Sequence, residues 1–301
     1  MQSIYAILKL GTTDLKQEEK KLLRSIEKIN NLYAVQLQLL LSLKKMEEHQ
    51  FELSQKKIIK VPEDAFLNDR LVNNQVFNSI SENTALSDFI ENNNLDVWGE
   101  EDRIVTELLN FTKSYKKYNA YMAKPQTSFN EDKSFITSLF KDVIAPNEKV
   151  CEYLEEACIS WTDDLPFANT MVLNSLERLK TGRSIHFGSI YKDEDDRAYV
   201  TELFTKTALN LSSYNEHLAN KTPNWDKERI AQIDMILIKM AICEFLNFPS
   251  IPARVTINEY IEISKEYTTK QSGFFINGIL DRVLKEFEAQ GKLQKIGRGL
   301  L

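Results

Sequence analysis

The 301-residue sequence is poor in the residues that interrupt regular structure, with nine glycines and seven prolines. So few turn signals favour long helices over many short strands. Its three cysteines, Cys151, Cys158 and Cys243, form no C-x-x-C pair. The first two lie seven positions apart on a predicted helix, too far for a disulfide. The sequence therefore predicts a reduced compartment and no zinc site.

Long apolar runs without charge are also missing. A membrane span needs about 18 or more such residues, and the longest candidate, Ile230–Leu246, contains Asp234, Lys239 and Glu244. No signal peptide is indicated, because the chain turns polar after Leu10 without a small-residue cleavage site. We expect a cytoplasmic protein that does not enter a membrane.

Catalytic patterns are absent as well. The three histidines have no Cys, Asp or Glu at metal-ligand spacing, and there is no G-x-S-x-G, G-x-G-x-x-G or P-loop. The acidic run at 193–196 is typical of a helix N-terminus, where negative charge is favourable. We predict no enzyme, no catalytic residue, no metal, no cofactor and no small-molecule substrate.

The apolar content of 43% is sufficient for a real core, whereas the net charge of −6 and the pI of about 5.4 describe an acidic chain. A protein that binds nucleic acid by phosphate neutralisation alone is more often basic. RNA binding by this chain would therefore need a local patch or a basic partner.

Helical periodicity covers most of the chain. A short first helix is closed by Gly11, and Asp14 caps a long helix that runs to about Met46. Asparagines crowd residues 61–95, which predicts short helices and loops. The helices expected next are 100–122, Asn130–Ala145, two that end near Trp161 and Lys180 before a stop at Gly182, and the apolar central helix Ile230–Leu246.

Two segments of the chain resemble each other in sequence. Residues 132–179 align without a gap on residues 196–243, at a constant offset of 64. Nine aligned positions are identical, among them Trp161 with Trp225. Chance alignment of amphipathic helices and true duplication of a three-helix unit both remain open.

Two pairs near the C-terminus carry further information. Adjacent residues on a helix point about 100° apart, so Phe274 and Phe275 cannot face the same core. An aromatic ring at the surface can stack on an unpaired base. In Asn277-Gly278, a glycine inside a helix predicts a close helix crossing where no Cβ fits.

Three segments in this order resemble the NusB family: the central apolar helix, Val255-Thr-Ile-Asn-Glu259, and Phe275-Ile-Asn-Gly-Ile-Leu-Asp281. The length resembles the enlarged Bacteroidetes-type members. The resemblance implies an all-α fold of two packed helical bundles, enlarged by a helical insertion. The expected ranges are 1–50 for the N-terminal NusB-like helices, 51–190 for the insertion (131–180 as the duplicated unit), 191–290 for the C-terminal NusB-like domain and 291–301 for a basic tail.

The same resemblance implies a transcription antitermination factor that promotes transcription of ribosomal RNA operons. Its expected partners are boxA RNA of the ribosomal RNA leader, the ribosomal protein NusE and the RNA polymerase antitermination complex. By position, Phe275, Gln271 and Lys239 match the RNA-binding face, and Asp234 matches the partner-binding side. Lys239 stands where relatives usually carry arginine, which keeps the charge but loses the planar fork.

The chain departs from the family at its start, because the usual arginine-rich arm is missing and no arginine precedes Arg24. Either the recorded start lies too late, which the uncapped first helix favours, or this member binds RNA weakly. The alternative function is a helical protein–protein adaptor without RNA binding of its own. An RNA methyltransferase with a NusB-like domain is a weaker rival, since it requires a cofactor-binding α/β domain that the printed sequence does not contain.

Overall fold

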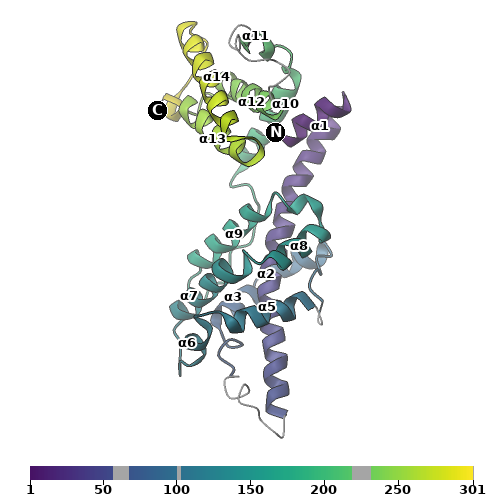
Figure 1. Ribbon diagram of the computed structural model, residues 1–301, viewed down its shortest axis with the longest axis vertical. Coiled ribbons are helices and arrows are strands. Elements are labelled where there is room, and N and C mark those ends of the chain that lie inside the picture. Colours follow the sequence, from purple (N-terminus) through teal and green to yellow (C-terminus); the bar gives the residue numbers. More distant parts are fainter. Residues whose placement is uncertain (57–67, 100–102, 219–231, 301) are drawn as a thin grey trace. The chain divides into compact units, whose positions relative to one another are not determined.

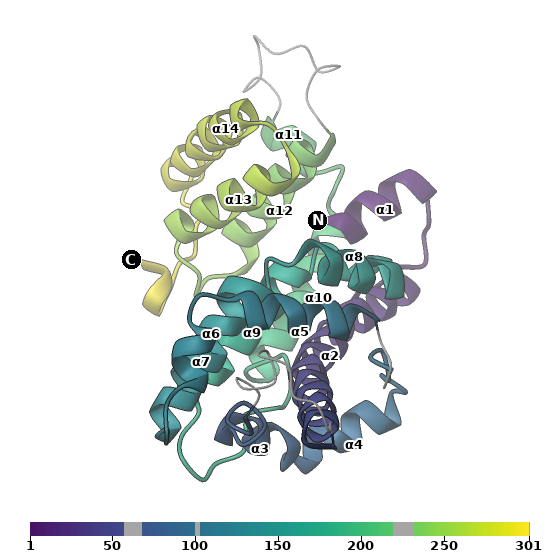
Figure 2. The same ribbon diagram turned by 60° about the horizontal axis from the view of Figure 1, so that its bottom comes forward.

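The computed structural model describes residues 1–56, 68–99, 103–218 and 232–300. Within these ranges every regular element is a helix (Figure 1; Figure 2), which confirms the all-α prediction. The chain divides into two compact units. We call Met1–Leu23 together with Tyr191–Leu301 the terminal unit, and Arg24–Ile190 the central unit. It stays a prediction that residues 1–50 and 191–290 form the NusB-like domain and that residues 51–190 are an insertion into it.

The terminal unit is built around one helix that is buried on nearly every side. Its elements are α1 (Gln2–Leu10), the start of α2 (Leu15–Lys56), α10 (Glu194–Leu209), α11 (Tyr214–Leu218), α12 (Gln232–Asn247), α13 (Ala253–Tyr267), α14 (Lys270–Ala289) and the short η4 (Gly297–Leu300). Helix α12 contacts α1, α10, α11, α13 and α14. The apolar pattern therefore predicted the central helix correctly, although Ile230 and Ala231 lie outside the described residues.

Local signals explain the first two helices. Gly11 adopts a left-handed conformation (φ 62°) and its N–H bonds to the Ile7 carbonyl, so α1 stops there as predicted. The Asp14 carboxylate accepts a hydrogen bond from the Gln17 N–H at 3.0 Å and caps α2. Helix α2 continues to Lys56, beyond the predicted end near Met46. The prediction stopped early because the buried face is continued by the polar Glu47 and Ser54, which hydrophobic periodicity does not detect.

The central unit contains the remaining helices. They are the rest of α2, α3 (Gln75–Ser81), α4 (Thr84–Asn92), α5 (Arg103–Ser114), α6 (Tyr118–Met122), α7 (Phe129–Leu139), η2 (Phe140–Ile144), α8 (Glu148–Ala157), η3 (Ile159–Trp161) and α9 (Leu165–Arg178). Asn74 caps α3 and Asn83 caps α4 through their side-chain oxygens. The asparagine-rich region therefore forms short capped helices in its described part, as expected.

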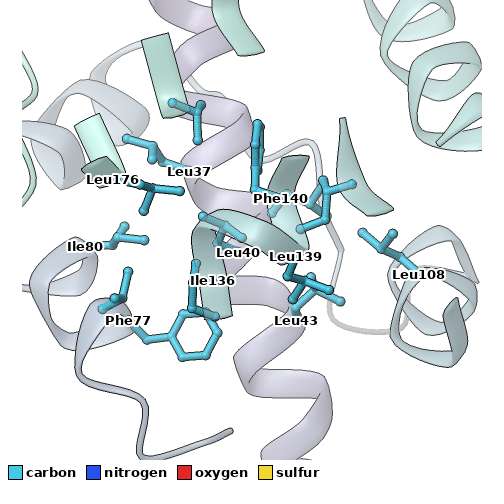
Figure 3. Close-up of a cluster of buried hydrophobic side chains, with 14 of the residues drawn as sticks. Leu37, Leu40, Leu43, Phe77, Ile80, Leu108, Ile136, Leu139, Phe140 and Leu176 are labelled. Carbon is cyan, nitrogen blue, oxygen red and sulfur yellow. The ribbon is translucent and has the colours of Figure 1, made fainter. Parts of the chain in front are cut away.

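The core of the central unit forms around α2, whose apolar side chains meet those of four other segments (Figure 3). Leu37, Leu40 and Leu43 follow one another at helical spacing and are at most 2% exposed. They converge with Phe77 and Ile80 of α3, Leu108 of α5, Ile136, Leu139 and Phe140 of α7 and η2, and Leu176 of α9. Helices distant in sequence thus bury one continuous apolar cluster.

Two further predicted helix limits, besides the end of α2, are wrong. The expected helix 100–122 is interrupted after Ser114, and Tyr118 opens the separate α6. After this break, the Tyr118 hydroxyl donates a hydrogen bond to Oε1 of the buried Glu47 at 3.1 Å. The Lys113 ammonium lies 3.0 Å from Oε2 of the same carboxylate. Helix α7 is capped by Ser128, in a capping box with Glu131, and not by Asn130.

The internal similarity extends to structure. Shifted by 64 residues, α7 with η2 falls on α10, α8 on α11 and α9 on α12, within a few residues at each end. Seven aligned pairs are buried on both sides: Leu139/Leu203, Phe140/Phe204, Val150/Tyr214, Leu154/Leu218, Val172/Ile236, Leu176/Met240 and Leu179/Cys243. The pair Asp132/Asp196 differs, since Asp132 is buried and Asp196 is exposed, and Trp225 lies outside the described residues. These shared positions support duplication, which stays a prediction.

The core predicts a large effect of truncating Phe140, which is fully buried. Replacing Phe140→Ala should lower the free energy of unfolding by about 3–5 kcal/mol, because it removes apolar contacts and leaves a cavity. Urea unfolding followed by circular dichroism measures this. The control is Phe167→Ala on α9, where the ring is 53% exposed. Equal losses from the two variants would contradict the packing in Figure 3.

Candidate nucleic-acid interface

A buried carboxylate fixes the arrangement of α10, α12 and α13. Glu244 of α12 is 3% exposed. Its Oε2 accepts from the Tyr199 hydroxyl of α10 at 2.6 Å and from the Tyr260 hydroxyl of α13 at 3.4 Å, and its Oε1 accepts from Thr256 at 2.6 Å. Burial and then the Glu244 charge raise the pKa values of both tyrosines, so both remain donors. The three hydroxyls compensate the desolvation of the carboxylate.

The segment after α14 is tied to the same helix. The Lys295 ammonium donates to the carbonyl of Phe248 at 3.0 Å and lies 3.5 Å from that of Glu244, at the C-terminal end of α12. Burial lowers the pKa of Lys295. Because Lys295 lies at the C-terminal end of α12, its positive charge is favourable with respect to the helix dipole. Lys292, also in the predicted basic tail, is exposed. The Arg298 side chain of the predicted basic tail lies outside the described residues.

Asp234, predicted on the partner-binding side, is 4% exposed in the first turn of α12. Its Oδ1 is buried without a hydrogen bond. Burial raises the pKa of Asp234, and the hydroxyls of Ser272 and Thr268 oppose that rise. Since Ser272 lies in the first turn of α14, the fold brings Asp234 beside the start of that helix.

The start of α14 presents two of the relevant side chains to solvent. Thr269 caps the helix by accepting from the Ser272 N–H. Gln271 is exposed, and Phe274 is 81% exposed. Phe275, by contrast, is 6% exposed and belongs to the core of the terminal unit. One of the two phenylalanines therefore lies at the surface, as predicted, and it is Phe274. The role of Phe275 in RNA binding stays a prediction, but its ring faces are not open to a base.

Gly278 does not mark a close helix crossing, so that prediction is wrong. A Cβ built on Gly278 meets no atom within 4 Å, and the residue is exposed. It follows Phe274 by four positions and so lies on the same face of α14. Together with Gln271, Phe274 and Gly278 form a stripe along α14, in which the exposed ring lies beside a residue without a side chain. We call Gln271, Phe274 and Gly278 the α14 stripe.

Lys239, the third predicted RNA-binding residue, is half-buried on α12, and burial lowers its pKa. It follows Asp234 by five positions, which places the two side chains about 140° apart around the helix. Lys239 and Asp234 therefore cannot serve one flat contact surface. This geometry fits their assignment to two different ligands.

Metal-binding groups and membrane-spanning helices are both absent from the described residues. No group of three or more His, Cys, Asp or Glu side chains there could hold a metal ion. Among the same residues, no helix combines the length and apolar content needed to cross a membrane.

Comparison with known proteins identifies the family. A profile of the NusB family matches residues 174–285. The transcription antitermination protein NusB of Salinibacter ruber is 39% identical over 110 residues, which are 36% of this chain and 69% of that protein. The chain belongs to the NusB family. Proteins of the same name from Chloroherpeton thalassium and Natranaerobius thermophilus are each 35% identical, over 122 and 88 residues.

These two family members are covered over 58% and 63% of their own lengths, and the matches include 40% and 29% of this chain. The family profile includes α12, α13 and most of α14, with the α14 stripe and Glu244. Most of the central unit precedes it. No solved structure matches this chain.

The Glu244 network predicts a strong dependence of stability on this carboxylate. Glu244→Ala leaves three hydroxyls without their acceptor and should lower the free energy of unfolding by about 3 kcal/mol or more. Urea unfolding of the variant measures the loss. Glu288→Ala, at an exposed position of α14, is the control. A Glu244→Ala protein as stable as this control would show that the network does not hold α10, α12 and α13 together.

Replacing Asp234, in contrast to Glu244, is predicted to raise the stability of the protein. The pKa of Asp234 is raised in the folded state, so the native protein binds the proton more tightly than the unfolded chain does. The carboxylate therefore lowers stability above both pKa values but not below the unfolded value of about 4. Asp234→Asn should raise the urea midpoint at neutral pH, by an amount that shrinks as the pH falls toward 4. A lower midpoint at neutral pH would refute this.

Proposed function

We propose that this NusB-family protein is a cytoplasmic transcription antitermination factor. It binds boxA RNA of ribosomal RNA leaders together with NusE, in the RNA polymerase antitermination complex. The names of its relatives support antitermination; boxA and NusE follow from the family resemblance. The observation that carries RNA binding is the ring of Phe274, 81% exposed on α14.

The α14 stripe has the chemistry of a single-strand RNA contact. A base can stack on the Phe274 ring, and such stacking tolerates any base because every base has a π-face. Gly278 leaves no Cβ to keep the base from the helix surface. The exposed Gln271 amide can donate to and accept from a base edge, which supplies sequence discrimination.

Lys239 and Phe275 contribute differently to this proposal. Half-burial of Lys239 reduces its hydration, and its ammonium meets a phosphate as a point charge. Phe275 packs in the core and keeps α14 in the rotation that exposes Phe274. Its part in RNA binding is then that of a positioning residue.

Asp234 is proposed to meet NusE. In the free protein its carboxylate is buried and its Oδ1 accepts no hydrogen bond, an arrangement that costs stability. Rotation toward solvent, where a cationic group of the partner can pair with it, relieves that cost. Partner binding and the start of α14 are thereby linked, since Asp234 lies beside Ser272.

The alternative is a helical adaptor without RNA binding of its own, which the acidic net charge favours. The two functions separate in a gel-shift titration of a boxA oligonucleotide, with and without NusE. A shift that depends on the protein supports the proposal. No shift in either case, together with a retained complex with NusE, favours the adaptor.

The proposal predicts that Phe274→Ala weakens boxA binding by about tenfold or more, because one stacked base contributes about 1–3 kcal/mol. Its stability should be almost unchanged, since the ring is exposed. Fluorescence anisotropy with labelled boxA RNA measures the affinity. Leu209→Ala, which removes a side chain 67% exposed on α10, is the control. Unchanged affinity in Phe274→Ala would remove the basis of the proposed RNA face.

A further inference from the structure

The central unit has a hollow on its α5 side that the α14 stripe does not include. Its volume is about 230 Å³, and it is lined by Glu107, Asn110, Phe111, Ser114 and Lys149. The Phe111 ring is 47% exposed, so an aromatic face opens toward solvent. An amide, a hydroxyl and an ammonium surround it.

Basic residues are frequent in the chain that follows the hollow's lining. Glu107 is already paired with Arg103 at 3.0 Å and with Lys149. Directly after Ser114 the chain continues Tyr115-Lys116-Lys117, and residues 113–124 contain four lysines and no acid. This local composition contrasts with the net charge of −6 of the whole chain.

Two of these lysines, Lys116 and Lys117, act on one acid, Asp142, whereas Lys113 pairs with Glu47 and Lys124 with Glu131. The Tyr115 hydroxyl donates to Asp142 at 2.5 Å, and Lys117 approaches Asp142 at 3.7 Å. The Tyr115 hydroxyl, followed by the charges of Lys117, Lys116 and Lys141, lowers the pKa of Asp142. Arg103 and Lys149 pair with Glu107, and Lys116, Lys117 and Lys141 act on Asp142, so these two groups together hold five cations and two acids.

We propose that this face of the central unit is a second binding site for single-stranded RNA. A base stacks on Phe111 in the hollow, Asn110 and Ser114 offer hydrogen bonds to it, and Lys116, Lys117 and Lys149 contact neighbouring phosphates. An exposed aromatic ring within a cationic surface is the arrangement that holds single strands without strong sequence preference. The inference rests on RNA binding as the proposed function, but on different residues.

The same unit provides a matched control. Phe167 on α9 is 53% exposed, comparable with Phe111, but the segment 150–177 that contains it carries six acids and no Lys or Arg. An RNA phosphate is repelled there. Phe167→Ala thus removes an equally exposed ring from an acidic surface.

The test measures binding of two probes, a boxA RNA and a uridine homopolymer of equal length. Phe111→Ala should weaken both by a similar factor of about tenfold, and Phe167→Ala neither. Lys116→Gln with Lys117→Gln should reduce the salt dependence of log K by about 1.4, at about 0.7 per lost phosphate contact. Circular dichroism confirms that the variants are folded. Wild-type affinity and salt dependence in the Phe111 and lysine variants would overturn the second site.

Photo-crosslinking with thiouridine-substituted RNA locates the contacts. Adducts on peptides of α5 support the second site, with or without adducts on α14. Adducts on α14 alone overturn it and leave the proposed function intact. Adducts on α5 alone contradict the α14 stripe instead. No adduct on either helix overturns both.

Discussion

The buried Glu244 carboxylate is the constraint on which the terminal unit depends. Helix α12 is apolar on nearly every face, so hydrophobic packing alone would leave its rotation weakly specified. A desolvated carboxylate, in contrast, must meet its donors at hydrogen-bond distance. Tyr199 on α10 and Thr256 and Tyr260 on α13 supply them. One polar contact thus sets the rotation of three helices, and α14 packs on two of them.

Three residues on or beside α14 are each thermodynamically unfavourable in isolation. Gly278 in an exposed helix interior is less stable than alanine by about 1 kcal/mol, Phe274 leaves a large apolar ring in water, and Asp234 is buried at a raised pKa. Each can be replaced by a more stable residue without disturbing the core. Phe274 and Gly278 lie on α14, and Asp234 lies beside Ser272 in its first turn. Positions that lower stability in this way are expected where function is retained at the expense of stability.

The sequence predicted helices well where apolar spacing is regular, as in α1 and α12. In the asparagine-rich region it predicted short helices, and α3 and α4 are such helices, each capped by an asparagine. It predicted that one of Phe274 and Phe275 lies at the surface without deciding which, and it assigned Phe275 to the RNA face. The buried Ile276, Ile279, Leu280 and Val283 place the core on the side of Phe275. The importance of Glu244 was not visible, because its hydroxyl partners lie 12 to 45 positions away. Gly278 was misread because a sequence does not show whether the space beside a glycine is filled by a helix or open.

The net charge of −6 is a sum over segments of unequal charge. It therefore does not tell whether one part of the surface can bind nucleic acid. Residues 150–177 carry six acids and no base, so the rest of the chain is neutral overall. Within that rest, Lys149 lines the hollow with the exposed Phe111, and residues 113–124 carry four lysines and no acid. At physiological salt, interactions between exposed charges fall off within about 8 Å. A phosphate therefore responds to the lysines beside it and not to the total, and an acidic protein can still present a cationic surface to RNA.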